Sequence, residues 1–255
     1  MRSIIQAFQY AGFVLYEYAR SGRMLIEVLA TAACMLVFFR PQVTPPTPEY
    51  FLTIAGVFSL GICLYSASAI FTLGDRITSY LALAHGLRRS SFLLGLYLSI
   101  VLLAAASYGL LCLAIAVINP VAGLDIRGWV MGSIPLLLNV TMLAALLTLL
   151  TPMVLSAGWR LLTLAFVALA FSGNLITGPT MAALPAPVAT TLDVLRTIFS
   201  APLLPAFTGF AVSVTRDYSN GSLLTPVAQA VMTIVLLVVA VRVFRRREVF
   251  FTQMA

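Results

Sequence analysis

The sequence predicts an all-α integral membrane protein with six transmembrane helices, and three observations support this fold class. Of the 255 residues, 61% are apolar and only 9% are charged, and the mean hydropathy is +1.05. The apolar residues gather in long runs, and the arginines collect at the ends of those runs. Because soluble globular proteins carry about 25% charged residues, this chain cannot expose its whole surface to water.

Residues 1–22 are predicted to form an amphipathic helix that lies in the membrane interface. Apolar side chains recur there at the spacing of one helix face, and polar side chains occupy another face. Ser21, Gly22 and Arg23 then interrupt the helix before the first span. The apolar positions are Ile4, Phe8, Ala11, Leu15 and Tyr18, and the polar ones are Gln6, Gln9, Glu17 and Arg20.

Six runs have a length compatible with a transmembrane helix, which needs about 20 apolar residues. Arg40 and Pro41 end the first run, which is short. In the fourth run, Pro135 and Pro152 are predicted to kink the helix, and Gly128 and Gly132 form one GxxxG step, which permits close helix contact. The predicted spans are residues 24–39, 50–73, 92–118, 129–155, 159–176 and 226–244.

The region 177–225 is long and largely apolar, yet prolines divide it into pieces that we expect to be too short to cross a membrane. Short apolar helices that avoid water suggest a re-entrant or interfacial hairpin before the last span. The alternative is that this region contains a seventh and an eighth span. The prolines are Pro179, Pro185, Pro187, Pro202 and Pro205.

The arginines predict the orientation of the chain, because cytoplasmic loops carry an excess of Lys and Arg. All 15 basic residues are arginine. If the N-terminus is cytoplasmic, four arginines lie outside and eleven inside, so both termini are predicted to be cytoplasmic. The outer arginines are Arg40, Arg127, Arg196 and Arg216. The inner ones are Arg2, Arg20, Arg23, Arg76, Arg88, Arg89, Arg160, Arg242, Arg245, Arg246 and Arg247.

The segment 74–91 is a basic connector between the second and third spans, and it is predicted to face the cytoplasm. A short helix there would present an apolar side that could occupy a groove on a soluble partner. Flanking arginines would set the orientation and the rate of encounter. The alternative is that these arginines only hold the topology and bind anionic headgroups. The apolar side comprises Tyr80, Leu81, Leu83 and Leu87.

With these elements in order, the chain resembles the permease subunit of an ABC-2-type transporter, also called the type V ABC exporter fold. In the connector, Asp75 and Arg76 stand at the acidic-basic position of that family, Arg88 and Arg89 at its basic position, and Gly95 at its closing glycine. The C-terminal sequence FRRREVFF also resembles the family's ending. The chain departs from the pattern twice: Gly86 replaces the usual proline, and Leu96 stands where a lysine is frequent.

The resemblance implies partners. A separate ABC ATPase in two copies would dock on the connector, and a second permease subunit, identical or different, would complete the assembly in a bacterial cytoplasmic membrane. ATP and Mg²⁺ would be bound by that ATPase. The residues predicted to dock are Asp75, Arg76, Tyr80, Leu83, His85, Arg88 and Arg89.

The chain itself is predicted not to be an enzyme and to hold no cofactor. It has no P-loop and no glycine-rich phosphate cradle, and its one histidine, His85, has no carboxylate pair nearby in the sequence. Cys34, Cys63 and Cys112 match no metal or redox spacing. Scattered arginines without interleaved aromatic residues also argue against a nucleic-acid partner, whereas membrane lipids are expected to surround the chain.

Three polar residues in the spans are candidates for a conduit or for contacts between helices. Glu27 is an acid one turn into the first span, where a carboxylate is a functional candidate, although it could instead pair with Arg23 on the same helix face. Asn139 and Asn174 need a hydrogen-bonding partner across a helix interface. Because so few polar residues lie at mid-membrane depth, we expect a hydrophobic, amphiphilic or lipid-linked substrate. Export driven by the partner ATPase is what the resemblance implies. The alternative is a non-transporting anchor or scaffold subunit of a larger membrane complex.

Overall fold

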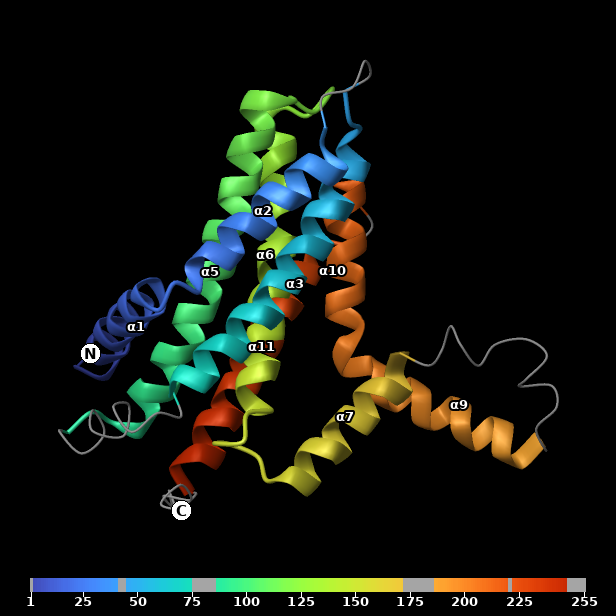
Figure 1. Cartoon of the computed structure of the whole chain (residues 1–255). Helices are drawn as coiled ribbons and strands as arrows, with labels where there is room; N and C mark the ends of the chain where they lie inside the picture. The colour runs from blue at the N-terminus through green and yellow to red at the C-terminus, as the bar shows by residue number, and fades with distance from the viewer. Residues whose placement is uncertain (1, 41–44, 75–85, 172–185, 220–221, 247–255) are drawn as a thin grey trace.

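The computed structural model describes residues 2–40, 45–74, 86–171, 186–219 and 222–246, and these residues form helices joined by turns, with no strand (Figure 1). The helices, in chain order, are α1 (Arg2–Arg20), α2 (Met24–Phe38), α3 (Pro48–Gly74), α5 (Arg89–Ile118), α6 (Ile126–Leu149), α7 (Ala157–Phe171), α9 (Ala186–Ser200), the 3₁₀ turn η2 (Ala201–Leu203), α10 (Leu204–Thr215) and α11 (Leu224–Arg246).

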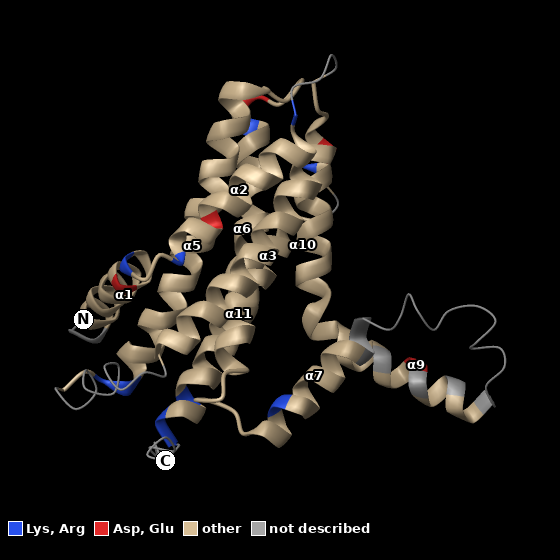
Figure 2. Ribbon diagram, in the orientation of Figure 1, with Lys and Arg blue, Asp and Glu red and all other residues tan. Residues whose placement is uncertain are grey.

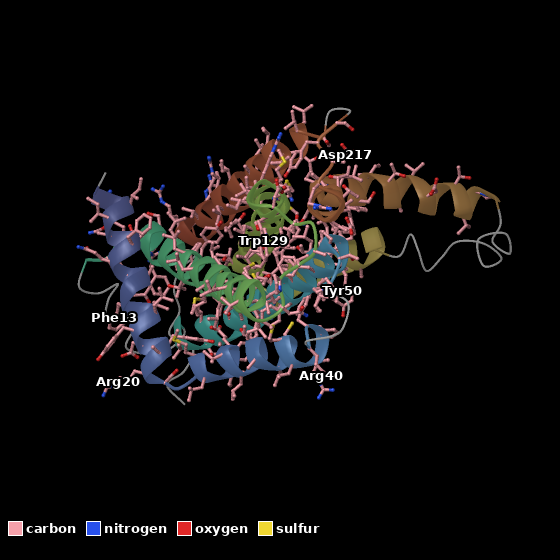
Figure 3. All side chains as sticks on the ribbon, turned by 90° about the horizontal axis from the view of Figure 1, so that it is seen from above. Phe13, Arg20, Arg40, Tyr50, Trp129 and Asp217 are labelled. Atoms are coloured by element: carbon pink, nitrogen blue, oxygen red, sulfur yellow. The ribbon has the colours of Figure 1, made fainter. Side chains whose placement is uncertain are left out.

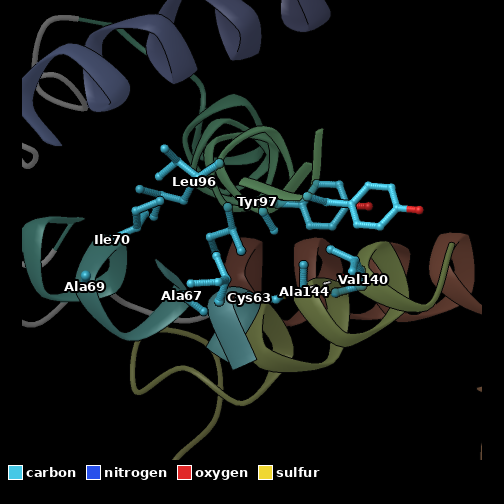
Figure 4. Close-up of a cluster of buried hydrophobic side chains, with 14 of the residues drawn as sticks. Cys63, Ala67, Ala69, Ile70, Leu96, Tyr97, Val140 and Ala144 are labelled. Carbon is cyan, nitrogen blue, oxygen red and sulfur yellow. Dashed lines mark hydrogen bonds between the residues drawn. The ribbon is translucent and has the colours of Figure 1, made fainter. Parts of the chain in front are cut away.

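Helices α3, α5, α6 and α11 form the central bundle, and α10 packs against α3, α6 and α11. Small side chains on α3 and α6 let the helices approach closely. In Figure 4, Cys63 and Ala67 of α3 face Leu96 and Tyr97 of α5, beside Ala144 of α6. All five of these side chains are buried, so the core is close-packed at this level.

The length and the hydropathy of the helices are those of a multi-pass membrane protein. Among the described residues, five helical segments are long and apolar enough to cross a membrane, and α1 with α2 makes a sixth if this pair, bent by 75°, is one span. The five segments are Pro48–Gly74, Arg89–Ile118, Ile126–Leu149, Asp193–Thr215 and Leu224–Arg246. The prediction of a multi-pass membrane protein is therefore confirmed.

Two predicted spans differ from the observed helices. The fourth, expected at 129–155, ends as α6 at Leu149, and turns follow from Leu150. Pro152 thus lies beyond the helix and does not kink it, whereas Pro135 lies inside it. The fifth, expected at 159–176, appears as α7, a 15-residue helix that is short for a span, and its predicted last residues, 172–176, lie outside the described part of the chain.

In the region predicted as an outer hairpin, residues 177–185 and 220–221 lie outside the described part. The described residues form α9, η2 and α10, followed by a turn and the first residues of α11. Figure 1 shows α9 pointing away from the bundle, whereas α10 runs along α3. We expected pieces too short to cross, but Asp193–Thr215 has 23 residues and sufficient hydropathy. Helix α7 packs on α9, where the rings of Phe166 and Phe199 stack with centroids 4.1 Å apart.

Charged side chains lie mainly at the two ends of the bundle (Figure 2). We call one end, which carries Arg88, Arg89, Arg160 and the arginines at the end of α11, the basic end. At the opposite end, Arg216 forms an ion pair with Glu49 at 2.7 Å and so links the end of α10 to the start of α3. Both described chain ends, α1 and α11, lie toward the basic end (Figure 1).

Candidate functional site

The candidate site is an apolar cavity of about 510 Å³ beside α6, between that helix and α7, α10 and α11. Asn139 and Thr163 are its two polar lining residues, and the others are apolar. Aromatic rings and methionines form much of its wall, among them Met142, Phe166, Phe199, Phe207, Phe210 and Met232. A cavity with this lining favours an apolar ligand over an ion or a polar solute.

Asn139 joins three helices at the cavity wall. Its Nδ2 atom donates a hydrogen bond to the carbonyl oxygen of Ala206 on α10, at 3.0 Å. Its Oδ1 atom accepts one from Nε2 of Gln229 on α11, at 2.7 Å. The same Gln229 nitrogen also donates to the carbonyl oxygen of Pro135, at 3.1 Å. Asn139 therefore both lines the cavity and joins α6 to α10 and α11.

Gly209 makes room for this amide pair. A Cβ atom at Gly209 would lie 1.9 Å from Nε2 of Gln229, which no side chain could tolerate without displacing the glutamine. Gln229 is fully buried, and its Oε1 atom has no hydrogen-bond partner in the described part of the chain. The position of α10 against α11 thus depends on a glycine facing a glutamine.

Pro135 creates a need for a hydrogen-bond donor in the middle of α6. A proline has no N–H group to offer the carbonyl four residues earlier, which is that of Met131. The hydroxyl of Tyr218, just after α10, donates to this carbonyl oxygen. The hydroxyl of Ser213 on α10 donates to the neighbouring carbonyl of Gly132 at 2.6 Å. Two carbonyl oxygens of α6, one of them left without a helical donor by Pro135, therefore hold the end of α10 and the residues after it against α6.

Gly132 is part of the predicted GxxxG step, and its contacts are within the chain. A Cβ atom there would lie 2.7 Å from a methyl group of Leu52 on α3 and 3.3 Å from the carbonyl oxygen of Ser213 on α10. Gly128 faces its own helix cap, because Asp125 accepts a hydrogen bond from its backbone N–H. Close packing at Gly132 serves the contact of α6 with α3 and α10.

Glu27 is buried and hydrogen-bonded at the bend between α1 and α2. Its Oε1 atom accepts from the hydroxyl of Tyr18 at 2.8 Å and from that of Ser66 on α3 at 2.5 Å. The expected pairing with Arg23 is replaced by another contact. Arg23 donates to the carbonyl oxygen of Ala69 at 2.8 Å and to the hydroxyl of Thr72 at 2.9 Å. Both residues thus tie this bend to α3.

The connector is described only at its end. Arg88 precedes α5 with an extended backbone, and Arg89 is the first residue of that helix; both are exposed. Gly86 has φ +94°, a left-handed conformation that favours glycine, and the family's proline could not adopt it. The other predicted docking residues, Asp75, Arg76, Tyr80, Leu83 and His85, lie outside the described residues, as does Asn174.

Helix α1 lies across the first turns of α5. Gly95 allows this close approach, since a Cβ atom there would lie 2.7 Å from the Tyr10 ring and 3.0 Å from the carbonyl oxygen of Ala7. One face of α1, which packs mainly on α5, is buried and includes Ala7, Tyr10, Ala11, Val14 and Tyr18. A second apolar face, including Ile4, Ile5, Phe8, Phe13 and Tyr16, remains exposed. In Figure 3, Phe13 and Arg20 point away from the bundle.

Sequence reasoning missed two residues of the site, Gln229 and Tyr218. A signal existed for each of them. Gln229 is the one amide side chain in the apolar run 226–244. Pro135 indicates that the carbonyl oxygen four residues earlier needs a hydrogen-bond donor from another segment. Neither signal could identify its partner, because the contacts join residues about ninety positions apart in the chain.

Among the residues that the structure describes, no group of three or more His, Cys, Asp or Glu side chains could hold a metal ion. Comparisons with protein-family models, with curated proteins and with solved structures found no match to the chain.

Proposed function

We propose that the chain is the membrane-spanning permease subunit of an ABC-2-type transporter, which exports a hydrophobic, amphiphilic or lipid-linked substrate while a separate ATPase hydrolyses ATP. The single observation that carries the proposal is the apolar cavity of about 510 Å³ in the helical bundle. A subunit that served only as an anchor would gain nothing from such a space, since close packing gives the more stable protein.

The lining of the cavity indicates the class of substrate. An apolar chain would lose contact with water on entering and gain dispersion contacts with the rings and aliphatic groups of the wall. Asn139 would offer the one strong polar contact on α6, suited to a hydroxyl, ester or amide group. Because the cavity lies against α7 and α10 at the side of the bundle, we propose that the substrate enters from the bilayer.

The connector 74–91 would receive the motion of the ATPase, and the structure provides a stiff continuation of it. Arg88 and Arg89 lead directly into α5, a 30-residue helix that passes through the whole bundle. Since α1 lies on α5 across Gly95, α1 would move with it. We place the basic end in the cytoplasm of a bacterium, by the arginine distribution, with two permease subunits and two ATPases in the assembly.

Association with an ATPase tests the proposal. The candidate is a P-loop protein encoded next to this chain, co-expressed with it and purified in mild detergent. We expect co-purification and ATP hydrolysis by the pair, and we expect Arg88→Glu with Arg89→Glu to lower association at least about fivefold by reversing two rim charges. The matched control is Arg40→Glu with Arg127→Glu, two exposed arginines at the opposite end.

A failure of every neighbouring P-loop protein to associate would overturn the transporter proposal and favour the scaffold alternative. Equal loss of association in both charge-reversal pairs would show that the connector is not the docking element. Narrowing the cavity tests the substrate class separately: Leu143→Trp should abolish stimulation of the ATPase by lipid-linked compounds while co-purification continues.

A further inference from the structure

A second hollow, unrelated to the cavity, lies between α5 and α11 near the basic end. This groove has a volume of about 370 Å³ and six lining residues: Leu94, Leu237, Val238, Val241, Arg242 and Arg245. Leu94 belongs to α5 and the other five to α11. Its wall is therefore aliphatic over most of its length and cationic at one end.

The change from apolar to cationic follows the axis of α11. Val238, Val241, Arg242 and Arg245 recur at the spacing of one helix face. With a rise of about 1.5 Å per residue, Val238 and Arg245 are separated by roughly 10 Å along the helix. This is the change from acyl-chain depth to headgroup depth that a bilayer requires at the end of a span.

The two guanidinium groups are available for a ligand. Arg242 and Arg245 are exposed, and within the described ranges neither has an acidic partner. They lie one helical turn apart, so both can reach one phosphate, and Arg binds phosphate with two parallel N–H groups. The ring of Phe244 stacks on that of Phe92 of α5 with centroids 6.1 Å apart, which fixes the end of α11 beside α5.

We propose that the α5–α11 groove binds one anionic phospholipid, with an acyl chain along Leu94, Leu237, Val238 and Val241 and the headgroup phosphate on Arg242 and Arg245. The observation behind it is the joining of an aliphatic groove to two adjacent arginines at headgroup depth. A lipid in this place bridges the starting turns of α5 and the last turns of α11. This proposal does not depend on the proposed transport function.

The test places a fluorescent reporter in the groove. Val238→Trp is combined with Trp129→Phe and Trp159→Phe, so that the introduced indole is the sole tryptophan. The protein is reconstituted in vesicles with dibrominated phosphatidylglycerol or dibrominated phosphatidylcholine, whose bromine atoms quench indole on contact. We expect phosphatidylglycerol to quench at a mole fraction roughly fivefold or more below that of phosphatidylcholine, because two arginines at headgroup depth attract the anionic lipid.

Two variants with equal loss of charge separate a site from general attraction to the surface. Arg242→Gln with Arg245→Gln should bring the ratio of the two lipids close to one. Arg20→Gln with Arg160→Gln removes two arginines from the same end of the bundle outside the groove, and should leave the ratio unchanged. An unchanged ratio in the first pair, or an equal fall in both pairs, would overturn the proposal. Because Arg242 and Arg245 are exposed, the first pair is expected to fold normally, which thermal unfolding checks.

Discussion

The hydroxyl of Tyr218 replaces a backbone donor that Pro135 removes, so its contribution to stability can be measured as a pair with the proline. Tyr218→Phe removes the donor and leaves the carbonyl of Met131 without one in a half-buried place. We expect a loss of about 1 kcal/mol in the free energy of unfolding, measured by titration with denaturing detergent in mixed micelles.

The reciprocal change tests the cause. Pro135→Ala returns an N–H group to the helix, which can then donate to the carbonyl of Met131. In that background we expect Tyr218→Phe to cost much less, so a double-mutant cycle should show a coupling of about 1 kcal/mol. The control is Tyr16→Phe, at an exposed tyrosine of α1. Additive costs would mean that the contribution of the Tyr218 hydroxyl does not depend on the N–H group that Pro135 lacks.

Two substitutions of Glu27 can separate the contribution of its charge from that of its hydrogen bonds. Glu27→Gln removes the charge but keeps an Oε1 acceptor for the hydroxyls of Tyr18 and Ser66. Glu27→Leu removes the acceptor and takes from the buried Tyr18 hydroxyl the carboxylate oxygen to which it donates, which costs about 1–3 kcal/mol. We therefore expect the leucine variant to unfold at distinctly lower denaturing-detergent concentration than the glutamine variant. Equal losses in the two variants would assign the role to the charge and not to the hydrogen bonds.

The contact between α1 and α5 depends on a single glycine, and the same helix offers its own control. Gly95→Leu would push a side chain into the Tyr10 ring and the backbone of Ala7, so α1 should lift from α5. We expect faster amide hydrogen exchange over residues 2–20 by at least about tenfold. Gly109→Leu, at a position on α5 with nothing within 4 Å, should leave this exchange unchanged. Protection of α1 in both variants would show that its other contacts suffice.

Helix α1 also shows how far the sequence determines an element. The helical spacing of apolar residues predicted an amphipathic helix, and α1 is one. The predicted apolar face, however, combined Ala11 and Tyr18, which are buried, with Ile4 and Phe8, which are exposed. The spacing of apolar residues determines only the angles between their side chains around the helix axis. It cannot tell which apolar face meets protein and which meets lipid, because both are favourable for an apolar side chain.

The candidate site was predictable to a smaller extent than the fold class. Composition and apolar runs sufficed for a multi-pass membrane protein, because transfer of such runs out of water dominates all local preferences. Asn139 was identifiable because a buried amide needs a partner. The cavity itself, and the contacts of Gln229 with Pro135 and Asn139, arise from how α6, α10 and α11 meet. That meeting depends on the sizes of side chains from distant segments, which no local pattern records.

At the scale of the whole molecule, the orientation in the membrane is the prediction on which the proposed function depends most. It can be tested in living cells with single cysteines. Cys34 and Cys63 are buried and Cys112 is half-buried, so all three are replaced by alanine to give a silent background. Ala122→Cys then marks the opposite end, and Ser156→Cys marks the basic end between α6 and α7; both positions are exposed.

A membrane-impermeant maleimide should label the cysteine at position 122 in intact cells, and the cysteine at position 156 only after the cells are permeabilised. The physical reason is the excess of arginines at the basic end, which holds that side in the cytoplasm. Labelling of position 156 in intact cells would place Arg88, Arg89 and the connector outside. A cytoplasmic ATPase could not then reach them, and the transporter proposal would fail. The proposal that the groove between α5 and α11 binds an anionic phospholipid would remain, with the lipid in the other leaflet.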